Sequence, residues 1–403
     1  MDVIVVGAGP AGSAAAAILA RSGCRVAVLD RARFPRAKPC GDYLNPGCDA
    51  VLDRLGVREA LARQARPVRG MRIVPARGDA VALPFPRDVG WAIPRRLLDH
   101  VLLAHAAASG AHVVEEARVV GLEQEARAVR VRVERPGPRH EQHAARLLIG
   151  ADGLRSTIAG MTGAGGPPRR GRYTVGAYLE GLRPEPGDPR GEYGELHLGV
   201  DRYCGVAYLA GGLANVTIAL PRGGLRAWRG ALEARYWDAL RAFPGLAGRL
   251  AHARRASEFR ASGPLAYWRR RAACGRVLLA GDAAAYIDPL TGQGIYLALR
   301  GAELAASYAH RALAGGAAVP APRAPLPALR EYERARRREF GPVFLLSRVL
   351  QRLAFSPALQ HRATQRIAAQ PDLGVRLIGA LGNLERAGTV LCPGFVARVL
   401  GIG

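Results

Sequence analysis

The fold is decided by the stretch Val3-Ile4-Val5-Val6-Gly7-Ala8-Gly9-Pro10-Ala11-Gly12. A short apolar run, of the length that a buried strand has, leads directly into glycines with the spacing G-x-G-x-x-G. An alanine-rich segment with strong helix propensity follows at residues 13–21, and Gly23 is expected to end that helix. A second apolar run, residues 26–29, leads to Asp30. This order of strand, glycine turn, helix, strand and acid is typical of a Rossmann-like α/β unit that binds a dinucleotide.

Each residue of this unit has a physical reason for its place. Gly7 permits the tight turn, Gly9 lets the backbone approach a pyrophosphate, and Gly12 lets the helix pack closely on the strand. Ala11 lies in the same turn, whose helix N-terminus offers free N–H groups to phosphates. The carboxylate of Asp30 can accept a hydrogen bond from a ribose hydroxyl. The alternative is a glycine-rich turn in an unrelated α/β domain, because an isolated G-x-G-x-x-G is weak evidence.

Length and composition indicate a globular enzyme. The chain has 403 residues, 49% hydrophobic and 23% charged, which is enough for two domains and a large core. No apolar run approaches the ~18 residues of a membrane span. Because the sequence begins directly with the first strand, we expect no signal segment. We therefore expect a cytoplasmic protein. The six cysteines are dispersed without metal-ligand spacing, so we expect free thiols and no metal.

The net charge of +25 does not indicate a nucleic-acid-binding protein. The basic residues are spread along the chain, and tight clusters occur only at residues 269–271 and 336–338, without interleaved aromatic residues. The positive charge is also compatible with peripheral binding of the protein to an anionic membrane or to an acidic partner. His140-Glu141-Gln142-His143 is expected in a polar turn between two strands, with no further ligand near it in sequence. The sequence does not indicate an oligomeric state.

Lys38 is the only lysine of the chain. Apart from the histidines, all other basic side chains are arginines. A lysine at this one position indicates that the site needs a compact ammonium group there. Chance survival of this one lysine is the alternative interpretation.

The rest of the chain alternates between α/β and antiparallel patterns. Residues 95–109 are predicted to form an amphipathic helix, and residues 112–120, 128–134 and 145–150 a β-meander. Short alternating strands are predicted from about residue 172 to 265, which is typical of an antiparallel sheet, with a helix near 224–242. Residues 328–403 are predicted to be helical.

Three separated motifs stand in order: Gly7–Gly12 with Asp30, Asp152-Gly153, and Gly281-Asp282. With this set the sequence resembles the FAD-dependent oxidoreductases of the aromatic-hydroxylase fold, and within them the geranylgeranyl reductase family, over most of residues 1–315. The resemblance implies that Gly281-Asp282 meets the ribityl chain and pyrophosphate of FAD. It also implies that Asp152 lies near the cofactor, in a segment often linked to NAD(P)H use, and that Arg95 contacts FAD.

The segment Lys38-Pro39-Cys40-Gly41-Asp42 is similar to the Lys-x-Cys-Gly-Asp segment that geranylgeranyl and menaquinone reductases carry beside the flavin. The resemblance implies that Cys40 and Gly41 lie at the isoalloxazine, with Cys40 on the substrate side. Cys40, Lys38 and Asp42 are then the candidate catalytic residues, since a thiol there can position substrate or transfer a proton. A packing role for Cys40 is the alternative. The aromatic substrate segment of those reductases is reduced here to residues 203–209, and we expect Tyr203, Cys204, Tyr208 and Trp91 in the pocket wall.

Gly292-Gln293-Gly294 is predicted to begin a long helix that reaches Leu313. Two glycines at a helix start let backbone N–H groups approach the flavin, where the helix dipole stabilises negative charge on its reduced form. An ordinary helix start after Pro289 is the alternative.

Together these features predict an α/β protein. The expected parts are a discontinuous Rossmann-like FAD-binding domain (1–75, 95–171 and 270–315), an interleaved antiparallel substrate domain (76–94 and 172–269) and a C-terminal helical region (328–403). The first functional hypothesis is reduction of a C=C bond in a hydrophobic isoprenoid or polyketide-like substrate by hydride transfer from reduced FAD. The second is a monooxygenase that hydroxylates or epoxidises a lipophilic or aromatic substrate through a C4a-hydroperoxide. No second G-x-G-x-x-G exists, so NAD(P)H is expected to bind only transiently, as reductant.

Overall fold

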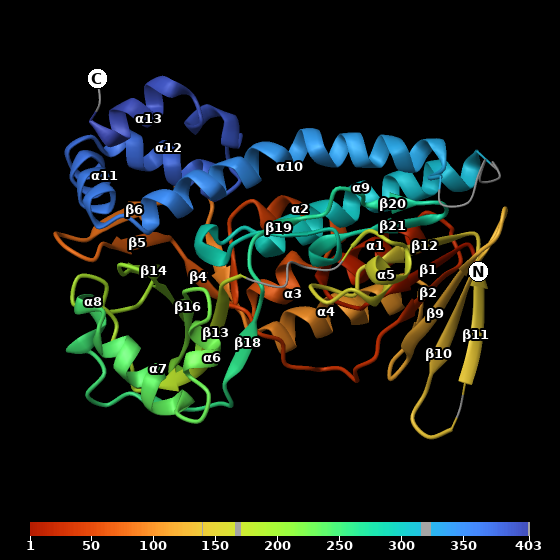
Figure 1. Cartoon of the computed structure of the whole chain (residues 1–403), viewed down its shortest axis with the longest axis horizontal. Coiled ribbons are helices and arrows are strands. Elements are labelled where there is room, and N and C mark those ends of the chain that lie inside the picture. Colours follow the sequence, from red (N-terminus) through yellow and green to blue (C-terminus); the bar gives the residue numbers. More distant parts are fainter. Residues whose placement is uncertain (139, 166–170, 316–323, 402–403) are drawn as a thin grey trace.

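The computed structural model describes residues 1–138, 140–165, 171–315 and 324–401. Its centre is a six-stranded sheet in the order β20-β21-β12-β1-β2-β8, in which all neighbours except β20 and β21 pair in parallel (Figure 1). The strands are β1 (Val3–Val6), β2 (Val26–Leu29), β8 (His112–Val114), β12 (Leu147–Gly150), β20 (Ala273–Cys274) and β21 (Val277–Leu279). All four residues of β1 and all four of β2 are buried, as expected of parallel strands covered on both faces.

Helices cover this sheet. They are α1 (Pro10–Arg21), α2 (Cys48–Leu55), α3 (Arg58–Ala62), α4 (Arg95–Ala108), α5 (Thr157–Met161) and α9 (Gly294–Ala314). The alanines of α1 are small enough to let it pack closely, and Ala14 to Ala17 are at most 1% exposed. The Rossmann-like fold predicted from the first thirty residues is therefore confirmed.

The predicted meander is partly wrong. The segment 112–120 is divided, because Glu116 has a φ of +54° and turns the chain between β8 and β9 (Arg118–Gln124). Strand β9 pairs with β10 (Val129–Glu134), and β10 pairs with β11 (His140–Ala145), in a separate antiparallel sheet. The polar turn predicted at residues 140–143 is in fact part of strand β11, which pairs with β10. Its polar composition does not prevent these backbone hydrogen bonds. Among the described residues no group of His, Cys, Asp and Glu could hold a metal ion.

A second large sheet lies beside the first, as predicted for the substrate domain. Its order is β17-β13-β16-β15-β14-β5-β6, with β18 paired to β13. The strands are β5 (Gly70–Val74), β6 (Val81–Pro84), β13 (Tyr173–Glu180), β14 (Tyr193–Leu198), β15 (Tyr203–Tyr208), β16 (Leu213–Leu220), β17 (Arg254–Arg255) and β18 (Arg260–Ser262). Strand β5 pairs with β14, so residues 70–74 belong to this sheet, although the predicted boundary placed them in the FAD-binding domain. We call this sheet the roof sheet.

Short helices cover the outer face of the roof sheet. They are α6 (Gly224–Ala227), α7 (Leu232–Arg241) and α8 (Pro244–Ala247). The single helix predicted near 224–242 is interrupted, because Gly230 has a φ of +81° between α6 and α7. Small two- and three-residue strands complete the chain: β3 (Tyr43–Leu44), β4 (Arg66–Val68), β7 (Gly90–Ala92), β19 (Tyr267–Trp268) and β22 (Ala285–Tyr286).

The predicted C-terminal helical region is confirmed. It consists of α10 (Pro327–Ala354), α11 (Pro357–Ala369), α12 (Pro371–Leu381) and α13 (Pro393–Leu400). The first half of α10 packs along α9, and the later helices gather at one corner of the molecule, drawn in blue in Figure 1. The hydroxyl of Tyr332, on α10, donates to the carbonyl of Leu279 at 2.7 Å, which ties this helix to the central sheet. None of the helices in the described ranges is both long and apolar enough to cross a membrane.

Candidate functional site

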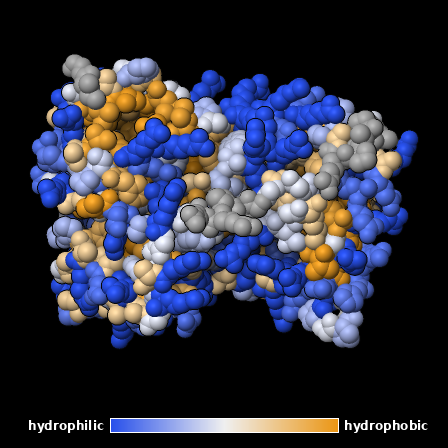
Figure 2. All heavy atoms as spheres, in the orientation of Figure 1, coloured by the Kyte–Doolittle hydropathy of each residue, from blue (hydrophilic) through white to orange (hydrophobic). Residues whose placement is uncertain are grey.

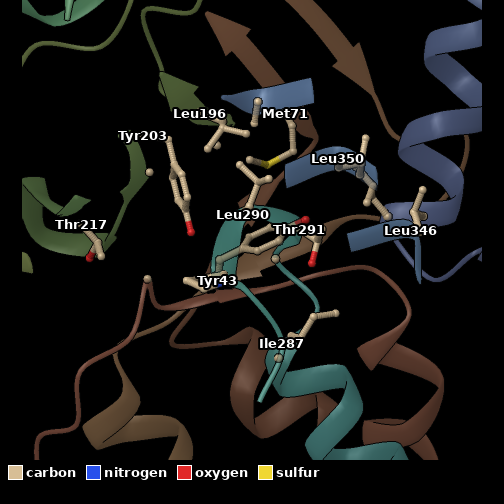
Figure 3. A pocket seen from close by; sticks show the side chains of 18 of the residues that line it. Tyr43, Met71, Leu196, Tyr203, Thr217, Ile287, Leu290, Thr291, Leu346 and Leu350 are labelled. Carbon is tan, nitrogen blue, oxygen red and sulfur yellow. The ribbon is translucent and has the colours of Figure 1, made fainter. Parts of the chain in front are cut away.

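A cavity of about 460 Å³ lies where the central sheet, the roof sheet and the C-terminal helices meet. Figure 3 shows Tyr203 and Leu196 entering it from the roof sheet, Tyr43 from the opposite side, and Leu346 and Leu350 from α10. The cavity is also lined by the turn at Gly9 to Ala11, by residues 38–41, and by the turns that contain Gly281 and Gly292. Segments far apart in the sequence therefore form one site.

The glycine turn has the geometry that a dinucleotide needs. Gly7 has a φ of +100°, and a Cβ there would lie 2.4 Å from the carbonyl oxygen of Ala151. A Cβ on Gly12 would lie 1.8 Å from the carbonyl oxygen of Gly7, so only glycine lets α1 begin this close to β1. Asp30, at the end of β2, accepts the backbone N–H groups of Ala8 at 2.7 Å and Ala32 at 2.8 Å. Its carboxylate is thus fixed beside the turn.

The space beside this turn is open to a ligand. A Cβ on Gly9 would meet only Arg36 Nη2, at 3.8 Å, and Cβ atoms on Gly41 and Gly294 would meet nothing within 4 Å. All three glycines line the cavity, so their backbones are open to a ligand. Gly281 has a φ of +58°, and its Cβ position lies 2.8 Å from Cβ of Ala11, which brings the two cofactor turns into contact.

Arginines gather at the same end of the cavity. Arg95 is 4% exposed and makes a two-pronged ion pair with Asp99, with Nε and Nη2 each 2.8 Å from a carboxylate oxygen. Burial opposes the charged form of Arg95, but Asp99 outweighs it and the pKa of Arg95 is raised. Arg36 Nη1 lies 3.0 Å from the same carboxylate. Two cations share one acid, so a net positive charge remains where phosphates would bind.

Lys38 lies opposite Gly281-Asp282. Its Nζ is 3.7 Å from Asp282 Oδ2, and a Cβ on Gly153 would lie 3.6 Å from it. Burial lowers the pKa of Lys38, against the attraction of Asp282. Lys38 therefore joins two of the predicted cofactor motifs, and this ammonium faces the cofactor residues rather than the roof sheet.

Cys40 lines the cavity as a free, partly exposed thiol. Burial raises the pKa of Cys40 against the opposing effect of Arg95, so the sulfur keeps its proton at neutral pH. The backbone carbonyl of Cys40 accepts Asn215 Nδ2 at 2.8 Å, which fixes the loop against strand β16 of the roof sheet. A protonated thiol in this position can donate a proton to a bound molecule.

Asp42 is 1% exposed and does not line the cavity. Its carboxylate accepts the hydroxyl of Tyr178 at 2.6 Å, Asn215 Nδ2 at 2.9 Å and the backbone N–H of Arg95 at 3.0 Å. Burial raises the pKa of Asp42, although these donors oppose the rise. The carboxylate of Asp42 is therefore engaged by neighbouring protein groups, one of which, Asn215, also donates to the Cys40 carbonyl.

Two other predicted cofactor residues have side chains that turn away from the cavity. The carboxylate of Asp152 accepts Ser156 Oγ at 2.6 Å and the N–H groups of Thr157 and Ile158, which caps helix α5. The neighbouring Gly153 lines the cavity instead. Gln293 Nε2 points toward the carbonyl of Ala380 at 3.4 Å, so its amide reaches α12.

The glycines on both sides of Gln293 do line the cavity. Gly292 has a φ of +65°, and a Cβ there would lie 2.7 Å from the ring of Tyr43. Tyr43 itself was not predicted as a site residue. It follows the Lys38–Asp42 segment directly, which is the signal that could have identified it.

Much of the cavity wall was missed by the sequence prediction. Tyr203 lines the cavity as predicted, whereas Cys204, Tyr208 and Trp91 do not. Alternation along β15 turns Cys204 and Tyr208 to the outer face of the roof sheet, where they join the core under α7. The missed residues come mostly from the C-terminal helices and are apolar: Leu346, Val349, Leu350, Leu353, Ile367, Leu377, Ile378, Leu381, Phe395 and Val399.

Known proteins resemble this chain over different parts of its length. Residues 1–177 match the family model described as FAD binding domain. Menaquinone reductase of Mycolicibacterium smegmatis is 40% identical over 166 residues, which is 40% of each chain. The chain thus matches about two fifths of the length of the menaquinone reductases. Digeranylgeranylglycerophospholipid reductase of Methanosarcina mazei is 29% identical over 327 residues, which is 78% of this chain and 76% of that protein.

Solved structures share the whole fold. A flavoprotein/dehydrogenase from Cytophaga hutchinsonii superimposes with a TM-score of 0.82 at 21% identity and covers 99% of this chain and 95% of its own. Several flavin-dependent halogenases have the same fold, at 23% identity or less. At such identities the likeness concerns the fold alone.

Proposed function

We propose that this chain is an FAD-dependent oxidoreductase and that it reduces a carbon–carbon double bond in a long hydrophobic substrate of isoprenoid or polyketide-like type. FAD fits the open glycine turns and the arginine cluster, and when bound and reduced it supplies a hydride. The reductases named for menaquinone and for digeranylgeranylglycerophospholipid among its relatives support the isoprenoid class.

The observation that carries the proposal is the apolar extension of the cavity. From the turn at Gly281 the cavity continues past Tyr203 and Leu196 into the space between α10, α11, α12 and α13. Leucine, valine, isoleucine and phenylalanine side chains line that space. Burial of a hydrocarbon chain against them is favourable by about 0.8 kcal/mol for each CH₂ group.

The residues of the chain then have separate roles. Gly7, Gly9, Ala11, Gly12 and Asp30 hold the adenosine and phosphate end of FAD. The backbone N–H groups at the start of α9 stabilise negative charge on the reduced cofactor, since a Cβ at Gly294 would meet nothing and the space beside them is open.

Residues in and around the loop 38–42 contact the cofactor and the substrate. Arg95, Lys38 and Asp282 bind the polar middle of the cofactor. The Cys40 thiol donates the proton that completes reduction of the double bond, and a water molecule then returns a proton to it. Asp42 keeps Cys40 in place through Asn215 and the backbone of Arg95. NAD(P)H is proposed as the transient reductant.

The test is anaerobic turnover. Protein loaded with FAD is reduced chemically without oxygen and mixed with a polyprenyl alkene, and flavin absorbance and product mass are followed together. We expect flavin reoxidation with a product heavier by two hydrogens.

The monooxygenase is the alternative that this experiment tests directly. It predicts no anaerobic consumption of the alkene, and an oxygenated product once air is admitted to the reduced protein. That result would overturn the reductase proposal. A flavin-dependent monooxygenase of Mycobacteroides abscessus is 34% identical over 181 residues, and this similarity supports the alternative.

A further inference from the structure

The cavity opens at the molecular surface between the C-terminal helices. Figure 2 shows a hollow there, surrounded by hydrophobic residues, at the corner that α11, α12 and α13 occupy in Figure 1. The cavity-lining residues Val349, Leu377, Leu381, Val396 and Leu400 are only partly buried. The apolar lining thus continues to the surface at this mouth.

We propose that this mouth docks on an anionic lipid bilayer, so that a lipid-dissolved substrate passes from the bilayer into the cavity without crossing water. The docking follows from the surface alone, and the passage of substrate rests on the proposed function. We call the docking face the mouth surface and define it by Leu345, Arg348, Arg352, Val396 and Leu400.

Helix α10, which lines the cavity with Leu346, Val349 and Arg352, carries the pattern of an interfacial helix. Leu345, Arg348 and Arg352 are spaced i, i+3 and i+7, so they share one face of the helix. All three are exposed, and Leu345 is 52% exposed, which makes it one of the few large apolar side chains open to solvent. Arg352 also lines the cavity. Apolar and cationic side chains together on an exposed face are typical of helices that lie in a membrane surface.

The charge of the region complements an anionic bilayer. Residues 345–401 contain seven arginines and two carboxylates. Of these, Arg398 pairs with Asp372 at 2.8 Å, whereas no hydrogen bond or ion pair is recorded for the side chains of Arg348 and Arg352 in the described parts of the chain. An arginine without a carboxylate is available to lipid phosphates.

A bilayer fits this face better than a folded partner or a second copy does. The mouth is concave and leads into a space lined by hydrocarbon side chains, so a flat protein surface would leave it unfilled. A second copy would bring arginines against arginines, which is unfavourable. Mobile lipid tails enter the mouth, while headgroup phosphates meet the arginines around it.

The test is co-sedimentation with vesicles, using the full chain loaded with FAD and no substrate. The vesicles contain phosphatidylcholine alone or phosphatidylcholine mixed with phosphatidylglycerol. We expect binding to the mixed vesicles, weakened at high salt as the screening length falls from about 10 Å at 0.1 M to about 3 Å at 1 M. Equal binding to both vesicle types, or no binding to either, would overturn the docking.

Variants locate the contact. Each arginine near an anionic surface is worth roughly fivefold in partitioning, so Arg348→Gln with Arg352→Gln should lower it roughly 25-fold. Leu345→Gln, which changes no charge, should lower it roughly fivefold, because about half of that side chain would be buried.

The matched control is Arg229→Gln with Arg235→Gln, which removes the same charge from exposed positions beside and on α7, at the outer face of the roof sheet. Its partitioning should stay within about twofold of the parent. An equal loss of vesicle binding in both double variants would show a general charge effect and would refute docking through the mouth surface. Light scattering at the same concentrations measures the oligomeric state. A dimer that dissociates in Leu345→Gln would show that the mouth surface binds a second copy of the chain, and would overturn the docking on lipid. Because no turnover is measured, docking and the proposed reaction fail or succeed separately.

Discussion

Cys40 depends on neighbours from three parts of the chain. Asn215 holds its carbonyl, Arg95 lies beside its sulfur, and Asp42 joins both through hydrogen bonds. These contacts hold the loop that carries the thiol at the cavity wall, while burial, against the effect of Arg95, keeps the sulfur protonated.

Cys40→Ala should lower turnover roughly 100-fold, because general acid catalysis contributes on the order of 10²- to 10⁴-fold. FAD affinity should change little, since the phosphate and adenosine contacts remain. Cys40→Ser should recover part of the rate, because its hydroxyl can donate a proton. Single-turnover reduction of an alkene measures the rates, and full activity in Cys40→Ala would show that the thiol only packs.

Lys38 is the next residue whose role can be isolated. Lys38→Met removes the ammonium beside Asp282, so we expect the Kd for FAD to rise about tenfold, which is roughly 1.4 kcal/mol. Lys38→Arg should recover only part of this affinity, because the planar guanidinium is larger than the ammonium in this buried place. Fluorescence titration with FAD measures both. An unchanged Kd in Lys38→Met would contradict a cofactor role and leave the catalytic one.

At the scale of elements, the start of α9 offers a pair of matched glycines. A Cβ at Gly294 meets nothing in the protein, and alanine favours a helix over glycine by up to about 1 kcal/mol. Gly294→Ala should therefore keep or raise the unfolding free energy and yet weaken FAD binding, because the added methyl group enters the cofactor space. Chemical unfolding and FAD titration measure the two effects.

Gly292→Ala is the contrasting variant. Its φ of +65° and the 2.7 Å approach of Cβ to Tyr43 should destabilise the fold itself by about 1–3 kcal/mol. If Gly294→Ala bound FAD as well as the parent does, the helix start would not contact the cofactor.

Strand β14 carries a buried charge network on the outer face of the roof sheet. Glu195 accepts His197 Nε2 at 2.7 Å and Arg249 Nη2 at 2.7 Å. Burial alone would raise the pKa of Glu195, but these two partners outweigh it and lower the pKa to about 2, from 4.5. The network joins β14 to the end of α8 and holds the sheet under its helices.

This network makes stability depend on pH in a defined direction. Between about pH 4.5 and 2 the unfolded chain binds the Glu195 proton and the folded chain does not. The contribution is therefore fully present above pH 4.5 and is lost as pH falls, by on the order of 3 kcal/mol. Urea unfolding at several pH values measures it. In Glu195→Gln this part of the slope should vanish, while neutral stability falls by about 3–5 kcal/mol, because Arg249 loses its nearest carboxylate and keeps only Glu185, at 3.8 Å. An unchanged slope would contradict the lowered pKa.

For the whole molecule, the cofactor site is formed by the central sheet, the roof sheet and the C-terminal helices together. FAD at 100 times its Kd should stabilise the protein by about 2.7 kcal/mol. For 403 residues that is a rise in Tm of about 3 °C, in one transition seen equally by circular dichroism and flavin fluorescence. Two transitions, with only one moved by FAD, would show that the parts unfold independently.

The sequence predicted the features that local chemistry determines. The turn at Gly7–Gly12, the acid at Asp30 and the helix at Gly294 appear where they were predicted, because each depends on a few adjacent residues. The strand at His140–Ala145 was missed because its pairing with β10, and not its composition, determines it.

The directions of side chains needed the tertiary structure. Asp152 caps α5 through residues four to six positions further along the chain, a local contact that the prediction overlooked. Gln293 reaches α12, and this contact depends on how separate elements pack. The apolar wall of the cavity was missed for the same reason. Helical periodicity shows that α10 has an apolar face, but it does not show that part of this face borders a cavity.

The hydrogen bonds from Asn215 to the Cys40 loop have a consequence for exchanging parts between related enzymes. Strand β16 and residues 38–42 are about 175 positions apart, yet Asn215 contacts Cys40 and Asp42 directly. A chimera that receives only a foreign roof sheet would lose these contacts and misplace its own thiol. Transfer of substrate preference should therefore succeed only when the loop and the roof sheet are taken from the same donor.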